Sequence, residues 1–67
     1  MSMEELEKRV KKLSMRATDA KMNLHDLAEE LPVDWEKIPE VAQATFEVYK
    51  DLTAARRELK AAKKAEA

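Results

Sequence analysis

The sequence of 67 residues contains no cysteine, no glycine and a single histidine. Without cysteine the chain has no disulfide bonds, no thiolate zinc sites and no cysteine-ligated iron–sulfur clusters. Without glycine it lacks glycine-rich phosphate loops, the dinucleotide-binding fingerprint and tight primed hairpin turns, because these need a residue that tolerates positive φ. A single histidine excludes sites built on a histidine pair. The composition therefore indicates a helical protein without a recognisable active-site motif.

Long apolar runs are also missing. The longest uninterrupted apolar stretch is a few residues, far short of the roughly 20 needed to cross a bilayer. The N-terminus lacks the apolar block of a signal peptide, so we expect a soluble, cytoplasmic protein with no membrane partner. Charged residues make up 40% of the chain, with 13 Lys and Arg against 14 Asp and Glu. The net charge of -1 gives no overall attraction to phosphate.

Apolar residues recur in two runs whose steps alternate between three and four, which is the heptad pattern of helices in a coiled coil. The first run comprises Met3, Leu6, Val10, Leu13, Ala17, Ala20, Leu24, Leu27 and Leu31. The second comprises Ile38, Val41, Thr45, Val48, Leu52, Ala55, Leu59 and Ala62. We therefore predict a single domain over residues 1–67, with helices over about 2–31 and 39–64 joined by a loop over 32–38.

Local signals mark the ends of these two helices. Ser2 and Glu5 have the spacing of a capping box at the start of the first helix. Pro32 and Asp34 are turn residues, and Pro39 suits the first turn of the second helix. Two helices of nearly equal length with a short connection predict an all-α, antiparallel two-helix hairpin. Folding the chain back here sets small residues opposite large ones, for example Ala17 opposite Leu52.

A lone hairpin leaves each seam open on one side, so we expect self-association into a four-helix bundle or a higher oligomer. Ala42, Phe46 and Tyr49 form a second stripe beside the seam and are the predicted oligomer interface. Residues 1–16 and 55–67 carry ten cations and five anions, whereas residues 17–54 carry three cations and nine anions. An antiparallel pair of hairpins sets these opposite charges side by side, so we favour the antiparallel dimer.

Three aromatic and two methionine side chains need separate interpretations. Trp35, Phe46 and Tyr49 are expected to cover the loop end of the core, because large rings supply much burial; the alternative is that they are exposed anchors for a partner. Met15 and Met22 lie seven residues apart, on the helix face opposite the seam. They are either partner-binding residues or isolated surface residues.

An acidic group surrounds Trp35 in the sequence. Glu29 and Glu30 lie in the last turn of the first predicted helix, where the helix dipole disfavours anions. Such a departure from local preference is enriched at functional places. With Asp26 and Glu36 they are candidates for docking a basic partner or another copy of the chain. The simpler interpretation is a set of well-solvated carboxylates.

His25 precedes Glu29 by four residues, which places an imidazole and a carboxylate on one helical face where they can hold a divalent metal ion. The simpler interpretation is a solvated or hydrogen-bonded histidine, and we otherwise expect no cofactor. The sequence offers no Ser/His/acid order and no phosphate loop, and a two-helix hairpin has no deep pocket, so we do not expect an enzyme.

Most of the chain resembles a known family. Residues 24–32 (LHDLAEELP), Trp35, residues 37–40 (KIPE) and the segment from Phe46 to Tyr49 resemble the Rop-like family of small helical-hairpin proteins encoded among nitrogen-fixation genes. The resemblance implies a non-enzymatic accessory or adaptor protein that contacts nitrogenase or its cofactor-assembly machinery. A metal carrier using His25 and Glu29 is one alternative.

RNA binding is the other alternative, since Rop itself binds RNA. The cations that such a role would use gather at the open end of the hairpin, where the two chain termini meet. No aromatic residue lies among these cations for base stacking, and the net charge is negative, so RNA is disfavoured as a partner.

Overall fold

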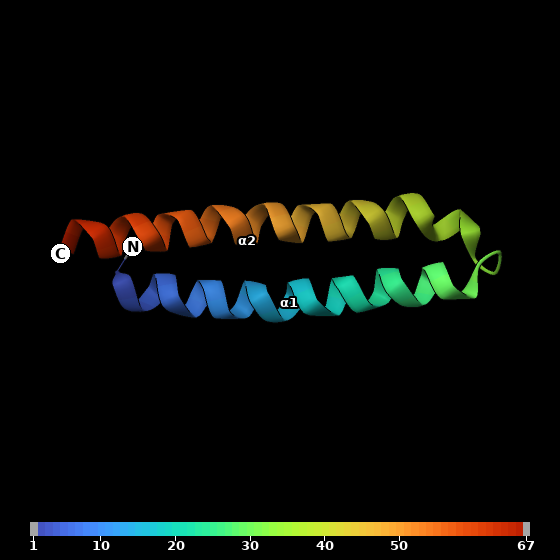
Figure 1. Ribbon diagram of the computed structural model, residues 1–67, viewed down its shortest axis with the longest axis horizontal. Helices are drawn as coiled ribbons and strands as arrows, with labels where there is room; N and C mark the ends of the chain where they lie inside the picture. The colour runs from blue at the N-terminus through green and yellow to red at the C-terminus, as the bar shows by residue number, and fades with distance from the viewer. Residues whose placement is uncertain (1, 67) are drawn as a thin grey trace.

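The computed structural model describes residues 2–66, so the two terminal residues of the predicted domain lie outside the described range. The chain forms helix α1 (Met3–Glu30), a 3₁₀ turn η1 (Trp35–Lys37) and helix α2 (Ile38–Glu66). The two long helices run side by side in opposite directions, and the loop joins them at one end of a rod of 51 × 15 × 15 Å (Figure 1). The all-α antiparallel hairpin is confirmed.

The helix ends differ from the predicted bounds by one or two residues. Helix α1 follows the cap at Ser2, whose side-chain Oγ accepts a hydrogen bond from the Glu5 N–H at 3.2 Å, and this is one half of the predicted capping box. Helix α2 starts at Ile38, so Pro39 lies in its first turn as expected. The helix then continues to Glu66, past the predicted end at about residue 64.

Backbone hydrogen bonds brace the loop between the helices. The Val33 N–H donates to the Glu30 carbonyl at 2.9 Å, and the Lys37 N–H donates to the Asp34 carbonyl at 2.9 Å. Asp34 has φ 57°, in the left-handed region that Asp and Asn tolerate better than most residues with a Cβ. A sequence without glycine thus uses Asp34 for the one left-handed position among residues 2–66.

The buried core lies at the middle of the hairpin and extends toward the open end. Leu13 and Ala17 of α1 pack with Leu52 and Ala55 of α2, and Val10 and Val48 pack against this cluster. The cluster contains the predicted pairing of Ala17 with Leu52. Leu6, one heptad before Leu13, is also buried. Alternation of small and large side chains allows the helices to pack closely there.

Burial also decreases toward the open end, where Met3 and Leu59 are half-buried, but it falls further toward the loop. Leu24, Leu27, Val41 and Thr45 are half-buried, and the last pair of the predicted seam is exposed, with Leu31 at 41% and Ile38 at 40%. Leu31 and Ile38, which the heptad pattern places in the seam, are therefore not part of the core of the single hairpin. The physical reason is that these two residues form the last layer before the loop, so neighbouring layers cover them on one side only.

The aromatic side chains are also more exposed than expected. Trp35 is 61% exposed, Phe46 is 62% exposed and Tyr49 is 38% exposed. The expectation that they cover the loop end of the core is wrong for the single chain, because Trp35 lies beyond the last seam layer and the other two lie beside the seam. The alternative, that they are anchors for a partner, stays a prediction. Within residues 2–66, neither helix has a segment long and apolar enough to cross a membrane.

Candidate interaction surface

The first candidate surface is a shallow groove along the exposed side of α2. Phe46 and Tyr49 form its apolar part, while Lys50 and Arg57 bring cations to its edge. Its volume is about 580 Å³, and the residues that line it are Thr45, Phe46, Tyr49, Lys50, Thr53, Ala54 and Arg57. Ala42, the third predicted interface residue, is exposed one helical turn from Phe46, outside this lining. The groove therefore combines an apolar floor with a basic edge.

A side-chain hydrogen bond links α2 to α1 on this side of the hairpin. The Arg56 Nη2 lies 3.4 Å from the Ser14 Oγ and donates to it. Arg56 follows Tyr49 by seven residues, which places both on one face of α2. Sequence reasoning missed this contact. The signal was present, because Ser14 and Arg56 occupy the same heptad position on the two helices, and equivalent flanking positions meet in an antiparallel pair.

The two exposed methionines lie on a separate face. Met15 is 63% exposed and Met22 is 58% exposed, and both lie on α1. Their spacing from the seam residues Leu13 and Ala17 places them on the opposite side of the helix from the core. They therefore lie apart from the aromatic groove of α2, and their predicted role in partner binding stays a prediction.

The second candidate surface is an acidic hollow at the loop end. Asp26 and Glu30 of α1 come together there with Asp34 of the loop and Glu40 of α2, and Lys37 is the cation among them. The hollow measures about 410 Å³ and is lined by Asn23, Asp26, Leu27, Glu30, Asp34, Lys37, Glu40 and Val41. The Lys37 Nζ lies 3.8 Å from the Asp34 Oδ2. The hollow thus contains four carboxylates and one ammonium group.

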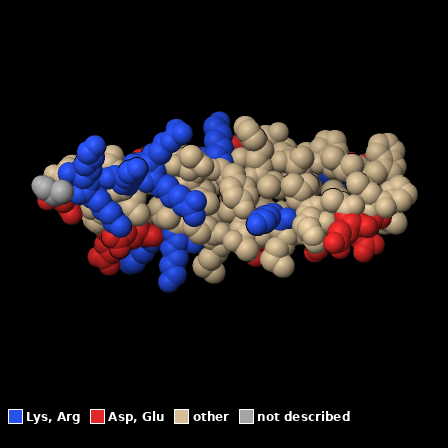
Figure 2. Space-filling model, in the orientation of Figure 1, with Lys and Arg blue, Asp and Glu red and all other residues tan. Residues whose placement is uncertain are grey.

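The structure divides the predicted docking residues near the loop into two groups. Asp26 and Glu30 line the hollow, whereas Glu29, Trp35 and Glu36 lie outside its lining. Figure 2 shows Lys and Arg side chains gathered over the open end and a group of carboxylates beside the loop, with a mostly uncharged surface between them. No charged side chain among residues 2–66 is buried. The charge separation predicted from the sequence is therefore a property of the solvated surface.

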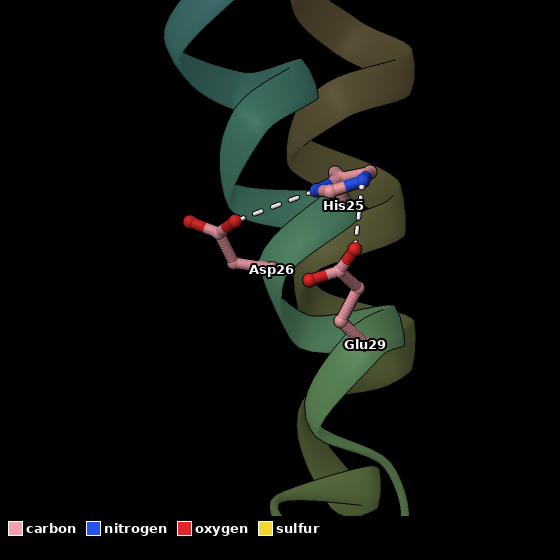
Figure 3. A network of polar contacts seen from close by, with 3 residues as sticks. All are labelled: His25, Asp26 and Glu29. Atoms are coloured by element: carbon pink, nitrogen blue, oxygen red, sulfur yellow. Dashed lines mark hydrogen bonds and ion pairs between the residues drawn. The ribbon is translucent and has the colours of Figure 1, made fainter.

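The candidate metal residues meet on α1 (Figure 3). The His25 Nε2 lies 3.3 Å from the Glu29 Oε1, and the His25 Nδ1 lies 3.5 Å from the Asp26 Oδ1. A protonated imidazole ring can donate to both carboxylates, whereas a metal ion needs one ring nitrogen without a proton. Within residues 2–66 no group of three or more His, Cys, Asp or Glu side chains has an arrangement suited to a metal ion. The metal hypothesis therefore still depends on His25 and Glu29 alone.

Several known proteins have sequences similar to this chain. The chain is 53% identical over 57 residues to a UPF0437 protein of Azorhizobium caulinodans, covering 85% of this chain and 83% of the relative. It is 46% identical over 59 residues to a UPF0437 protein of Nostoc sp., covering 88% and 83%. A relative in Frankia alni, 44% identical over 46 residues, is named as a UPF0437 protein in the nifX–nifW intergenic region; 69% of this chain and 56% of that relative are covered.

No solved structure matches the chain. The sequence model of a family described as Rop-like matches residues 1–64, which is nearly the whole hairpin, including both candidate surfaces. Together with the relatives, this match confirms the resemblance seen in the sequence. The chain belongs to the Rop-like family.

Proposed function

We propose that this chain is a non-enzymatic accessory protein of nitrogen fixation that acts by contact with nitrogenase or with the proteins that assemble its cofactors. The observation that carries this proposal is the name of the Frankia alni relative, which places that protein between nifX and nifW. Neighbouring bacterial genes often serve one process, and the relatives from Azorhizobium and Nostoc have the same family description. The gene position of the Frankia relative, together with the shared family, supports a role of this chain in the same process.

Action by contact is supported by the character of the surface. Large apolar side chains are exposed on three parts of the molecule, including Met22 on α1, Trp35 in the loop and Phe46 on α2. Enzymes place reacting groups in pockets that exclude most of the solvent. Here every charged side chain among residues 2–66 is in contact with water. Exposed aromatic residues are typical of protein interfaces.

The proposal includes a homodimer as the working form. The chain belongs to a family described by its likeness to the Rop helical bundle. The accessible surface of this chain is 5452 Å², whereas a compact protein of its mass exposes about 4,300 Å². The excess of roughly 1,100 Å² is comparable to the area that one partner buries in an ordinary stable interface, about 800 Å². Pairing through Ala42, Phe46 and Tyr49 covers the apolar floor of the groove.

An antiparallel pair of hairpins is the favoured arrangement. The open end carries an excess of five positive charges and the loop half an excess of six negative charges. Antiparallel pairing sets these charges side by side, while parallel pairing sets like charges together. Attraction of this kind acts over about 10 Å at 0.1 M salt. The dimer should therefore dissociate more readily as the salt concentration rises.

A genetic experiment tests the nitrogen-fixation role. The gene for the Azorhizobium caulinodans relative is deleted, and the strain is complemented with this chain. We expect slower growth and lower acetylene reduction with dinitrogen as the sole nitrogen source, normal growth on ammonium, and rescue by this chain. Equal growth of the deletion and parent strains on dinitrogen would contradict the proposal, as would an equal defect on ammonium.

A capture experiment tests the partner class. The tagged chain is expressed in the complemented strain, and the proteins retained are compared between cells fixing dinitrogen and cells grown on ammonium. We expect enrichment of nitrogenase or cofactor-assembly proteins. Charge reversal of Glu29 and Glu30 should reduce this capture, whereas reversal of Asp19 and Asp51, two exposed carboxylates away from the loop, should not. Capture of structured RNA in place of these proteins would favour the RNA-binding alternative.

A further inference from the structure

The loop end carries four large apolar side chains that are substantially exposed. Leu31, Val33, Trp35 and Ile38, here called the apolar cap, are exposed by 40% to 61% and lie within eight consecutive residues. Single exposed apolar residues are ordinary on protein surfaces. Four of them at one end of a narrow rod form a local concentration of the kind that marks interaction sites. The cap includes the only tryptophan of the chain, the residue type most enriched at binding hot spots.

The backbone that carries the apolar cap is held in place before any partner binds. The Val33 N–H donates to the Glu30 carbonyl at 2.9 Å, and the Trp35 N–H donates to the Pro32 carbonyl at 3.4 Å. The Lys37 N–H donates to the Asp34 carbonyl, and the side chains of these two residues pair at 3.8 Å. A surface that is already ordered loses less conformational freedom on binding than a flexible loop does.

The acidic hollow adjoins the apolar cap, because Asp34 and Lys37 belong both to its lining and to the loop segment that carries the cap. Its four carboxylates outnumber its single cation, and that cation is already paired with Asp34. The hollow therefore favours a positively charged group from outside. Arg and Lys combine such a charge with an apolar stem, which suits a site that has both kinds of surface.

We infer that the apolar cap and the acidic hollow form one docking site for a segment of a partner protein in which an apolar side chain stands next to Lys or Arg. This inference rests on the proposed function and specifies the chemistry of the partner. A second copy of the chain fits this site poorly. The open end of the hairpin offers cations, but its apolar residues near the C-terminus are alanines, such as Ala61 and Ala65, which give Trp35 little to pack against.

A peptide titration with the purified full chain tests the inference. The probes are a short synthetic peptide of leucine and lysine and its leucine and glutamate counterpart, each carrying a fluorescent label whose anisotropy reports binding. We expect the lysine peptide to bind and the glutamate peptide not to bind. Trp35→Ala should weaken binding about 30-fold, the value for loss of a hot-spot side chain. Gln43→Ala, which shortens an exposed side chain of α2 outside both the cap and the hollow, should change it less than about twofold.

A second pair of variants tests the hollow. Glu30→Gln with Glu40→Gln removes two of its carboxylates and should weaken lysine-peptide binding about tenfold at low salt, with a smaller effect at high salt. Asp19→Asn with Asp51→Asn removes the same number of charges elsewhere and should have little effect. Circular dichroism should give the same helix content for every variant, since all the altered side chains are exposed.

Several outcomes would overturn the docking site. These are equal peptide affinity for the parent and Trp35→Ala, equal weakening by Gln43→Ala, or end-to-end assembly of the chain that Trp35→Ala abolishes while the lysine peptide does not bind. Failure of the proposed function is distinguishable from these results. If nitrogenase proteins are captured equally by the parent and Trp35→Ala, the docking site is wrong and the function stands. If the peptide binds as expected and no growth defect on dinitrogen occurs, the function fails and the docking site stands.

Discussion

The two halves of this hairpin are built on one continuous seam and differ in how it is packed. Toward the open end, the seam residues Leu13 and Ala17 on α1 and Leu52 and Ala55 on α2 are buried. Toward the loop, Leu24 and Val41 are only half-buried, and the last pair of seam residues is exposed. The charge changes along the same direction, from basic at the open end to acidic at the loop.

This difference indicates that one half of the hairpin stabilises the fold and the other half is available to bind a partner. The half that is packed within one chain holds the two helices of the hairpin together. The half near the loop keeps its apolar area available, both on the groove of α2 and on the apolar cap. Apolar burial is the main source of stability and of association alike, so area left open in one chain is area that a second molecule can cover.

The largest effect is expected at the groove. Phe46→Glu should weaken dimerisation by about 4 kcal/mol, because each dimer contains two copies of the side chain and a hot-spot residue contributes about 2 kcal/mol. Sedimentation equilibrium over a range of concentrations measures the change. Met22→Glu introduces the same charge at a similarly exposed position on the opposite face and is the control. Equal dissociation by both variants would mean that the groove of α2 is not the interface.

A smaller effect, on the free energy of unfolding, should distinguish the packing of the two halves. Leu52→Ala removes a buried side chain and should lower the free energy of unfolding by about 3 kcal/mol. Leu27→Ala makes the same change at a half-buried position near the loop and should lower it by about 1 kcal/mol. Urea unfolding followed by circular dichroism, at one protein concentration, compares the two. If both variants lose the same stability, then association buries the loop half as fully as the open half.

The smallest effect is expected at His25. The contacts of His25 with Asp26 and Glu29 are exposed, and even charged pairs on the surface contribute little in water. His25→Gln should therefore change the free energy of unfolding by less than about 0.5 kcal/mol. Calorimetric titration of chelator-treated protein with zinc should give the same trace for the parent and the variant. Heat of binding that only the parent shows would instead support a metal site at His25 and Glu29.

The sequence predicted the helices and the seam because both depend on local and periodic signals. Steps of three and four placed Leu13 and Leu52 on facing sides, and Pro32 and Asp34 marked the turn. The same periodicity shows which side of a helix a residue occupies, but not whether anything covers that side. Leu31 and Ile38 illustrate this limit, because they continue the pattern correctly and still lie exposed at the last layer.

The candidate sites were harder to predict from the sequence than the helices and the seam were. The contact of His25 with Glu29 follows from a spacing of four residues and could be predicted. The hollow also needs residues from the loop and from α2, so its lining depends on how the loop orients Asp34 and Lys37. The left-handed conformation of Asp34 sets that orientation, and no periodic signal encodes it.

The rod shape has a consequence for the spacing of bound molecules. Side-by-side pairing of two antiparallel hairpins thickens the particle and leaves its length near that of one chain, 51 Å. The two loop ends then point away from each other, so two molecules docked there are held apart by the helices between them. One added heptad in each helix lengthens that spacer by about 10 Å. The number of heptads therefore sets the distance between two molecules bound at the two loop ends of the dimer.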